Sequence, residues 1–429
     1  MENPNTGAGN IKKFQVTNNR TGNSVDLSAG IVEYSFYENV LSNNITARAI
    51  VVETGNQDQG AQDSTIDGLP IRGGEKVVIE VEDATQQPIT LRNPLRVNKI
   101  GKATPGTRQD VYVLELATDE YHLNEQTRVT KQYQGKISDN VRTILTEVLK
   151  TEEPLDIDDT ALDINFFGNT KKPFYTVTWL ASKSVPDTGV GAAAGYLFYQ
   201  TRDGLFFKSI DKLFEQEPTK KFFLNDTQAL PPGYDAKVLK YNIGSNIDLH
   251  TQQSIGAYNN RSIYFDFYAM NYKVVDFSIE EQEGKAKTAG PDYINVDEEF
   301  VAEPTRLYNH ILDVGVNPPG SGDEQLRNQK KDPTAPNYKA EDTMVQTIMR
   351  YNQMFTVRAD VIIPGDFTIK CGDIVQCDFP QLKGGREQEI NRQSGGKYMV
   401  ASVCHRITGK DTLTSLGLVR DSFGKEGGF

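Results

Sequence analysis

The feature that most constrains the fold of this chain is a weak internal repeat, whose two copies lie near opposite ends of the 429 residues. Three pairs of segments resemble each other and keep the same order in both copies. Residues 46–52 resemble 356–362, residues 71–77 resemble 369–375, and residues 95–97 followed by 114–116 resemble 398–400 followed by 416–418. The distance between the copies is far too long for a solenoid. The repeat therefore predicts two homologous units, with other material inserted between and within them.

The segments of the repeat have the composition of β-strands. Residues 31–37 and 44–52, for example, are rich in β-branched and aromatic side chains. In both copies a glycine, Gly74 or Gly372, is followed by an acidic residue and then by apolar residues. Glycine adopts a positive φ without steric cost, so this step is typical of a tight turn that leads into a strand. Short strands separated by turns predict a β-barrel or a β-sandwich, and the repeat favours two barrels of one kind.

Between the two copies the pattern changes. Apolar residues recur at helical spacing between Ile137 and Leu149, and a second helix is expected after Pro173, near residues 175–184. A β-hairpin is expected over residues 195–210. The predicted fold class is therefore mainly β with an α/β insertion. The expected organisation is a first β-barrel over 1–120, an α/β insertion domain over 121–235, a second β-barrel over 236–270 plus 341–421, an extended linker or insertion over 271–340 and a flexible tail over 422–429.

Composition and charge exclude several classes of function. With 46 basic and 58 acidic residues, the formal net charge is −12, which disfavours wrapping nucleic acid or binding an anionic membrane. Three cysteines are too few for a disulfide scaffold. The N-terminus lacks an apolar signal segment, and no run of about 18 apolar residues is present to span a bilayer. We therefore expect a soluble protein made in a reducing cytoplasm.

Motifs for nucleotide, metal or nucleophile chemistry are weak. Residues 189–194 match the glycine pattern of dinucleotide sites, but a helix is expected before them and a strand after them, the reverse of what such a site needs. Cys404 and His405 could act as a nucleophile pair, yet neighbours on a strand point to opposite faces. No histidine has the spacing of a metal ligand. The four are His122, His250, His310 and His405.

Acidic clusters and an Arg-Asp-Gly sequence also have simpler interpretations. Asp156, Asp158 and Asp159 resemble part of a calcium loop but lack its glycine and closing glutamate. Three glutamates at 280, 281 and 283 could be paired carboxylates for glycoside chemistry, although a solvated acidic run is favoured. Residues 202–204 make a good hairpin turn. We expect Cys371, Cys377 and Cys404 to be buried as small apolar groups. The sequence predicts no catalytic, cofactor-binding or metal-binding residue, no cofactor and no enzymatic activity.

Two further features bear on packing and contacts. The single tryptophan, Trp179, lies among apolar residues near a predicted helix, so we expect it in a core, with an interface anchor as the alternative. Residues 341–355 predict a helix that carries Met344, Met349 and Met354. These methionines would pack against the second unit or contact a neighbouring chain, because methionine adapts to irregular surfaces.

Arranged in this way, the chain resembles the baseplate hub proteins of contractile-tailed, myovirus-like bacteriophages. The likeness rests mostly on the C-terminal part. Residues 394–400 followed by 403–406 are similar to the family's penultimate strand and its Val-x-His step, and residues 413–420 are similar to its last strand. Residues 363–366 and 372–375 match the preceding pair of strands. The predicted helix and hairpin of the insertion fall where the family carries its own insertion.

The resemblance implies two tail-tube-like β-barrels in each chain and a homotrimer whose six barrels form a pseudo-sixfold ring. Such a ring would adapt the sixfold tail tube to the threefold central spike and would line the DNA channel. The implied partners are the central spike protein, the tail tube or tube-initiator ring proteins and the baseplate wedge proteins. Phage DNA would pass without specific binding, and no membrane insertion is implied. The implied location is the virion tail baseplate, assembled in the host bacterial cytoplasm.

Two other functions are kept as alternatives. The first is the hub or spike base of a related contractile injection system, a tailocin or a type VI secretion system. Capsid and portal genes beside this gene would favour the phage. The second is a tail-attached carbohydrate-binding or glycan-degrading β protein. A single tryptophan in 429 residues speaks against that second function, because sugar-binding surfaces use exposed aromatic rings.

Overall fold

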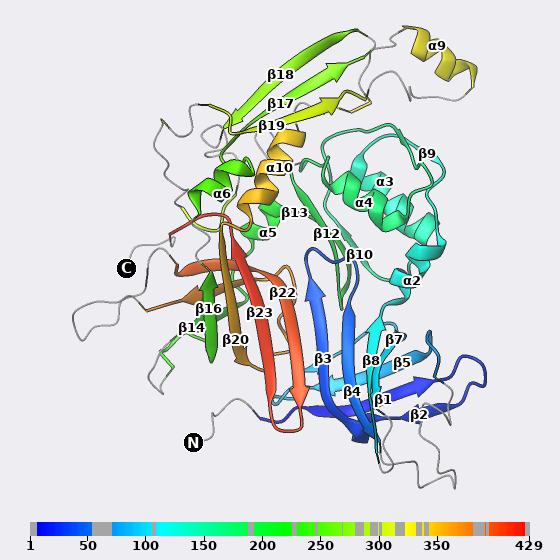
Figure 1. Cartoon of the computed structure of the whole chain (residues 1–429), viewed down its shortest axis with the longest axis vertical. Coiled ribbons are helices and arrows are strands. Elements are labelled where there is room, and N and C mark those ends of the chain that lie inside the picture. Colours follow the sequence, from blue (N-terminus) through cyan, green and yellow to red (C-terminus); the bar gives the residue numbers. More distant parts are fainter. Residues whose placement is uncertain are drawn as a thin grey trace, which may run out of the picture.

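Strands dominate the computed structural model. It describes residues 7–53, 71–104, 109–187, 193–224, 230–244, 248–267, 269–278, 287–291, 299, 303–313, 322–331, 337–338, 343–380, 391 and 394–424. Strands account for 45% of the chain and helices for 18%, which confirms a mainly β protein. Figure 1 shows large sheets at one end, a helical region beside them and a small sheet at the other end. Within the described ranges no helix is long and apolar enough to cross a membrane.

The first group of strands comes from the N-terminal part of the chain. It consists of β1 (Asn10–Thr17), β2 (Ser24–Asp26), β3 (Ile31–Asn39), β4 (Thr46–Glu53), β5 (Lys76–Glu82), β6 (Pro88–Ile89), β7 (Leu95–Thr104) and β8 (Asp110–Ala117), with a 3-10 turn at Ser28–Gly30. The strands pair in the order β3-β4-β8-β7-β5-β1-β2, with β6 beside β5. Alternation places Val77, Ile79 and Val81 of β5 in one buried core. In Figure 1, β1 and β2 lie across the lower ends of β3 and β4, so the group bends around this core.

The second group of strands repeats this order. It consists of β14 (Lys220–Phe223), β15 (Ala236–Lys237), β16 (Lys240–Gly244), β20 (Val357–Pro364), β21 (Ile374–Asp378), β22 (Gly396–Thr408) and β23 (Thr412–Arg420). The strands pair in the order β16-β20-β23-β22-β21-β14-β15. Taken in this order, each strand matches the strand at the same place in the first group, so that β16 matches β3 and β22 matches β7. The matching strands also follow one another in the same order along the chain. They differ in direction at one edge, because β14 is parallel to β21 whereas β1 is antiparallel to β5.

The glycine turns of the two groups have the same backbone hydrogen bonds. Gly74 N–H donates to the carbonyl of Val97 at 2.7 Å, and Val97 N–H donates to the carbonyl of Glu75 at 3.0 Å. In the second group, Gly372 N–H donates to the carbonyl of Val400 and Val400 N–H donates to the carbonyl of Asp373, both at 2.9 Å. Both glycines have positive φ, +84° and +88°. The predicted glycine turn is therefore present in each group. In each group the pairing with the next strand also shifts register just after the valine.

Strand pairing aligns the repeat residue by residue and corrects one part of it. Leu116 lies opposite Val97, and Leu418 lies opposite Val400. Leu116 therefore corresponds to Leu418, as the sequence comparison predicts. On the next strand, Leu116 faces Ala47 whereas Leu418 faces Ala359. Residues 46–52 therefore correspond to 358–364, two residues further than expected. A shift of two keeps every side chain on the same face of the strand, so the apolar pattern hides it.

The two groups form one 15-stranded sheet, because β22 also pairs with β3. In the part of the chain that the structure describes, this sheet does not close on itself, and the two closed β-barrels expected from the sequence are not seen. Each group is instead a bent, open sheet with its own core. Three side chains cross between the cores: Val40 packs in the second core, and Phe367 and Ile407 of the second group pack in the first.

The region between the two groups is the predicted α/β insertion. It contains α2 (Asp119–Gln126), β9 (Gln132–Tyr133), α3 (Ile137–Thr143), a π-helical continuation (Ile144–Leu149), β10 (Leu155–Ile157), β11 (Phe166–Phe167), α4 (Pro173–Ala181), β12 (Tyr196–Thr201), β13 (Gly204–Ser209) and α5 (Ile210–Glu215). Both predicted helices and the hairpin are confirmed. A proline at the first position of α4 suits a helix start, since its missing N–H would be unpaired there. The sheet β10-β13-β12, α3 with its π-helical continuation and α4 share a third core, whereas α5 packs in the second core.

The remaining elements lie within the stretch expected to be a linker or insertion and on either side of it. They are α6 (Leu249–Ser254), β17 (Asn259–Asp266), β18 (Asn271–Ser278), β19 (Arg306–Ile311), α9 (Asp323–Lys331) and α10 (Met344–Gln353). Residues 271–340 are therefore not simply an extended linker, because they contain β18, β19 and α9. The two strands escaped detection since they are largely exposed and lack apolar alternation. They flank β17 in a separate three-stranded sheet. The domain boundaries themselves stay a prediction.

Candidate assembly surfaces

The join between the two groups of strands sets how the two units are held in one chain. One edge of β22 is occupied by β23, and the other is shared by β21 and β3. The pairing with β3 is antiparallel and runs from Ser402 opposite Asn39 to Thr408 opposite Glu33. Cys404 lies opposite Tyr37 in the middle of this ladder. The join is thus a continuous strand pairing between two similar units.

A buried carboxylate fastens the join. Glu38, near the end of β3, is 1% exposed. Its oxygens accept hydrogen bonds from the backbone N–H of Arg202 at 2.9 Å and of Cys371 at 3.1 Å. Burial raises the pKa of Glu38, and the nearby Arg202 guanidinium and the two backbone donors oppose this effect. The Arg-Asp-Gly turn of the insertion and the glycine turn of the second group are both tied to β3 through this one side chain.

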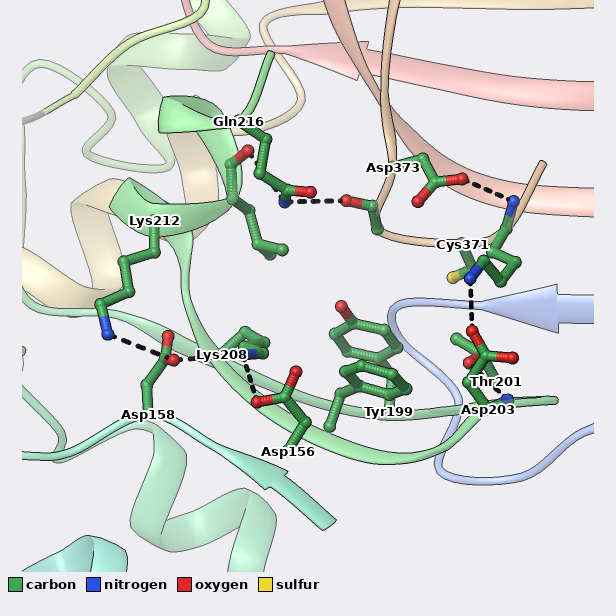
Figure 2. Close-up of a pocket in the computed structure, with 14 residues that line it drawn as sticks. Asp156, Asp158, Tyr199, Thr201, Asp203, Lys208, Lys212, Gln216, Cys371 and Asp373 are labelled. Carbon is green, nitrogen blue, oxygen red and sulfur yellow. Dashed lines mark hydrogen bonds and ion pairs between the residues drawn. The ribbon is translucent and has the colours of Figure 1, made fainter. Parts of the chain in front are cut away.

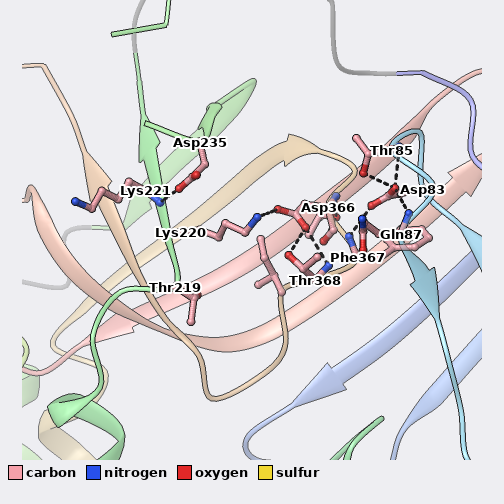
Figure 3. A network of polar contacts seen from close by, with 12 residues as sticks. Asp83, Thr85, Gln87, Thr219, Lys220, Lys221, Asp235, Asp366, Phe367 and Thr368 are labelled. Atoms are coloured by element: carbon pink, nitrogen blue, oxygen red, sulfur yellow. Dashed lines mark hydrogen bonds and ion pairs between the residues drawn. The ribbon is translucent and has the colours of Figure 1, made fainter. Parts of the chain in front are cut away.

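A second network, shown in Figure 3, binds the loop before the glycine turn from both sides. Asp83, after β5, accepts hydrogen bonds from the backbone of Thr85 and Gln87 and, across the join, from Phe367 N–H at 3.0 Å. Asp366 forms an ion pair with Lys220 of β14 at 3.1 Å. The Phe367 ring is thereby held in the core of the first group. Rotation of one unit against the other would break the contacts that Phe367 makes with Asp83 and with this core.

His405 is buried at the join and is neutral. Its Nε2 lies 3.1 Å from the carbonyl of Ile369, and its Nδ1 lies 3.0 Å from the hydroxyl of Thr414. A carbonyl can only accept, so Nε2 carries the proton and Nδ1 accepts from Thr414. Burial, helped by the positive charge of Arg202, lowers the pKa of His405 from 6.5 to about 3. Its neighbour Cys404 is on the opposite face and half-buried, so the two do not form a nucleophile pair.

Acidification should therefore weaken the fold through His405. Below pH 6.5 the unfolded chain binds a proton at this residue that the folded chain refuses until about pH 3, so stability is lost as pH falls. At pH 4.5 the loss should be about 2–3 kcal/mol. The H405Q variant keeps a donor and an acceptor but does not titrate. Urea unfolding at pH 7.5 and 4.5 should show a steeper loss in the wild type, and an equal loss in both would contradict the assignment.

A buried arginine ties the second group to the insertion, and sequence reasoning missed it. Arg350 of α10 is 1% exposed and pairs with Asp211 of α5 at 2.9 Å and with Asp421 just after β23. It also donates to the carbonyl of Lys287. Each carboxylate accepts a further backbone N–H, from Ala193 at 3.1 Å and from Ala289 at 2.9 Å, respectively. Four segments distant in the sequence meet at this one guanidinium.

A pocket of about 320 Å³ lies between the β12–β13 hairpin, α5 and the second glycine turn (Figure 2). Three lysines and four aspartates line it, and each lysine forms an ion pair with at least one aspartate. The pairs are Lys208 with Asp156 and Asp158, Lys212 with Asp158, and Lys370 with Asp203. The positive charges are thus balanced within the pocket, which makes it a poor site for an anionic ligand. Asp156 and Asp158, two of the three aspartates that resemble part of a calcium loop, therefore hold lysines here.

The other residues singled out in the sequence are dispersed. His122, His250 and His310 lie in α2, α6 and β19, far from His405 in β22. Among the described residues, no group of three or more His, Cys, Asp or Glu is placed to hold a metal ion. Cys371 and Cys377 are buried, as predicted, and burial raises the pKa of both thiols. Residues 188–192, which include most of the glycine pattern, and the three glutamates at 280–283 lie outside the described residues.

The packing predictions for aromatic and methionine residues have mixed outcomes. Trp179 is half-buried at the edge of the third core, 5.4 Å from the Phe166 ring and covered by the Lys183 ammonium at 4.8 Å. It is not an exposed platform for a sugar. Met349 and Met354 are buried, and Met354 packs in the second core, so the core interpretation of these two is confirmed.

The separate sheet β18-β17-β19 exposes large apolar side chains. Their exposed fractions range from 40% at Phe265 to 86% at Met270. The set is Phe265, Phe267, Met270, Tyr272, Val274, Leu307 and Ile311. In Figure 1 this sheet projects from the end of the molecule opposite the large sheet. A cluster of this kind is typical of a surface that another protein covers.

Comparison with known proteins supports the fold assignment. No protein-family model and no curated protein matches the sequence. Solved structures do match. The 43 kDa tail protein of prophage MuSo2 from Shewanella oneidensis superimposes with a TM-score of 0.52 over 96% of this chain and 98% of that one, at 8% identity. The tail protein from Neisseria meningitidis MC58 gives 0.50 over 96% and 97%, at 9% identity.

A third match comes from a solved complex of two proteins. A chain of the Francisella PdpA-VgrG complex superimposes with a TM-score of 0.50 and 9% identity. The match covers 100% of this chain but 55% of that one. At such identities the likeness establishes a shared fold. The resemblance to bacteriophage tail proteins that the sequence predicted is therefore confirmed at the level of the structure.

Proposed function

We propose that this protein is the structural hub at the centre of a phage tail baseplate, and that it acts as a homotrimer with six tube-like units in one ring. The observation that carries the proposal is the shared pairing order of two strand groups, β3-β4-β8-β7-β5-β1 and β16-β20-β23-β22-β21-β14, in a chain with the fold of phage tail proteins. Two similar units in each of three chains approximate sixfold symmetry on one face and keep threefold symmetry on the other. Each unit would contribute one segment of a tube-like wall.

This arrangement suits a mechanical role without catalysis. A ring with six similar edges can start a sixfold tail tube, and its threefold face can hold a central spike. The contacts of Glu38 and Asp83 keep the two units of each chain in a fixed relation. A channel wall that shared the negative sign of the chain's net charge of −12 would repel phosphates, so DNA would pass without adhering. The location that follows is the virion tail, with tube, spike and wedge proteins as partners.

The alternative is the hub of a related contractile injection system, such as a tailocin or a type VI machine. The fold shared with a chain of the Francisella PdpA-VgrG complex favours keeping it. The two possibilities predict the same ring and differ in genomic surroundings. Capsid and portal genes beside this gene would favour the phage, and their absence would favour the relatives.

The mass of the purified protein in solution tests the proposed function. Light scattering at micromolar concentration should give three times the 47.8 kDa of one chain. Electron images of the same sample should show rings with an open centre. Permanent assemblies of this kind usually bury about 2,000 Å² or more per interface, so the trimer should persist on dilution. A stable monomer at micromolar concentration would overturn the hub proposal.

A further inference from the structure

Two strands at equivalent places in the two groups differ in their surroundings. β3 pairs with β4 on one edge and with β22 on the other, and Tyr34, Ser35 and Phe36 are buried there. In the described part of the chain, β16 pairs with β20 alone. Tyr241 is 48% exposed, and four of the five residues of β16 are exposed. The second group thus presents an open strand edge where the first group has a partner.

β7 shows the complementary difference. Its counterpart β22 uses the edge away from β23 to bind β21 and then β3. β7 uses the same edge to bind β5 at Leu95 and Arg96 only. From Lys99 onward, β7 pairs with β8 on one side and with no other described strand on the opposite side. The stretch that is open in β7 corresponds to the stretch of β22 that binds β3.

We infer that β16 of one copy pairs with β7 of a second copy, in the same way that β3 pairs with β22 within the chain. The inference deepens the proposed function, on which it rests, by naming the strands of the interface. Within one chain, β3 and β22 already form this contact. Among the described strands, the equivalent ones, β16 and β7, each leave the corresponding edge open. A chain that offers a β16 edge and a β7 edge on different units binds head to tail, and such contacts close into rings.

The intrachain join also predicts the register. β7 and β22 each shift register just after a valine, Val97 or Val400, so these two valines are equivalent. Counting four residues onward, Gly101 of β7 is equivalent to Cys404 of β22. Ala47 of β4 is equivalent to Ala359 of β20, so the residues before them, Thr46 and Arg358, are equivalent too. Thr46 faces Tyr37 and Arg358 faces Gly244, so Gly244 of β16 is equivalent to Tyr37 of β3. Since Cys404 faces Tyr37, Gly101 of one copy should face Gly244 of the next. The pairing is antiparallel strand addition, in which main-chain hydrogen bonds supply affinity. An unpaired edge is otherwise a site of uncontrolled association.

A pair of cysteines tests this register directly. A Cβ at Gly101 would have no heavy atom within 4 Å, and at Gly244 the nearest is the carbonyl of Arg358 at 4.0 Å, so both positions accept a side chain. Directly opposed residues in antiparallel strands have Cα atoms about 4.5–5.5 Å apart, within disulfide reach. Mild oxidation of the full-length G101C/G244C protein should give covalently linked chains on a non-reducing gel. Mixing the two single variants should give linked dimers only.

The chain supplies its own matched controls. Y37C should form a disulfide with the native Cys404 inside one chain, which reports on the same ladder position in the known join. G101C combined with N242C, displaced by two residues, should link far less. Each single variant, oxidised alone, accounts for any background from the three native cysteines.

The outcomes separate this inference from the proposed function. Linkage in a series that stops at three chains supports both. A mass of three chains without linkage in G101C/G244C overturns the strand pairing and leaves the hub. Linkage that continues beyond three chains supports the pairing and overturns the trimer. A monomer without linkage overturns both.

Discussion

Replacing Arg350 with methionine should lower the free energy of unfolding by about 3–5 kcal/mol. The substitution keeps most of the apolar stem but leaves Asp211 and Asp421 as buried carboxylates without a cation. Asp211 retains the backbone donors Ala193 and Lys287, and Asp421 retains the Ala289 N–H and the Ser422 hydroxyl. These neutral donors do not replace the lost charge. Urea unfolding monitored by circular dichroism would measure the loss.

Two comparisons make this result specific to the buried charge. R358M removes an exposed arginine from β20 and should change stability by less than about 1 kcal/mol. Burial already raises the pKa of Asp211, and Arg350 opposes this rise. Without the arginine the carboxylate takes up a proton more readily in the folded state, so the stability of R350M relative to the wild type should recover as pH falls toward 5. Adding D211N and D421N should restore most of the loss. Equal stability of R350M and R358M would contradict the role assigned to Arg350.

The strands of the repeat and the helices and hairpin of the insertion could be predicted from the sequence because they leave local traces. The alternation in β5, the helical spacing from Ile137 to Leu149 and the glycine turns are all properties of neighbouring residues. The register of β20 could not be predicted in the same way. Side chains alternate with a period of two, so a shift of two residues leaves the apolar pattern unchanged. Only the pairing of Ala359 with Leu418 resolves it.

The buried polar contacts of the candidate site are not indicated by any local sequence pattern. Glu38, Asp83 and Arg350 look like ordinary surface residues in the sequence, and their burial depends on distant partners. Glu38 binds a backbone group 333 residues away, and Asp83 binds one 284 residues away. The pairing of β3 with β22 is equally invisible, because any two alternating strands satisfy the same pattern. The repeat predicted that two units exist, but their edges had to be seen before a contact between chains could be inferred.

The glycine turn of the second group should tolerate substitution worst of all the turns in the repeat. Gly372 has φ of +88°, which strains any β-branched residue, and its Cβ would lie 2.4 Å from the Tyr199 hydroxyl. Backbone strain of about 1–3 kcal/mol adds to overpacking of similar size, so G372V should cost about 2–6 kcal/mol. K370A removes a partly exposed ion pair with Asp203 and should cost less than about 1 kcal/mol. Equal thermal stability of the two variants would contradict the turn assignment.

The equivalent glycine of the first group separates strain from crowding. Gly74 has φ of +84°, but its Cβ would meet only the Asn19 amide at 3.4 Å. G74V should therefore suffer the backbone strain alone, about 1–3 kcal/mol. The excess loss in G372V measures the contact with β12, and Y199F should relieve part of it in G372V but none in G74V. If G74V and G372V lose the same stability, crowding by Tyr199 is negligible. The insertion would then not press on the second unit at this turn.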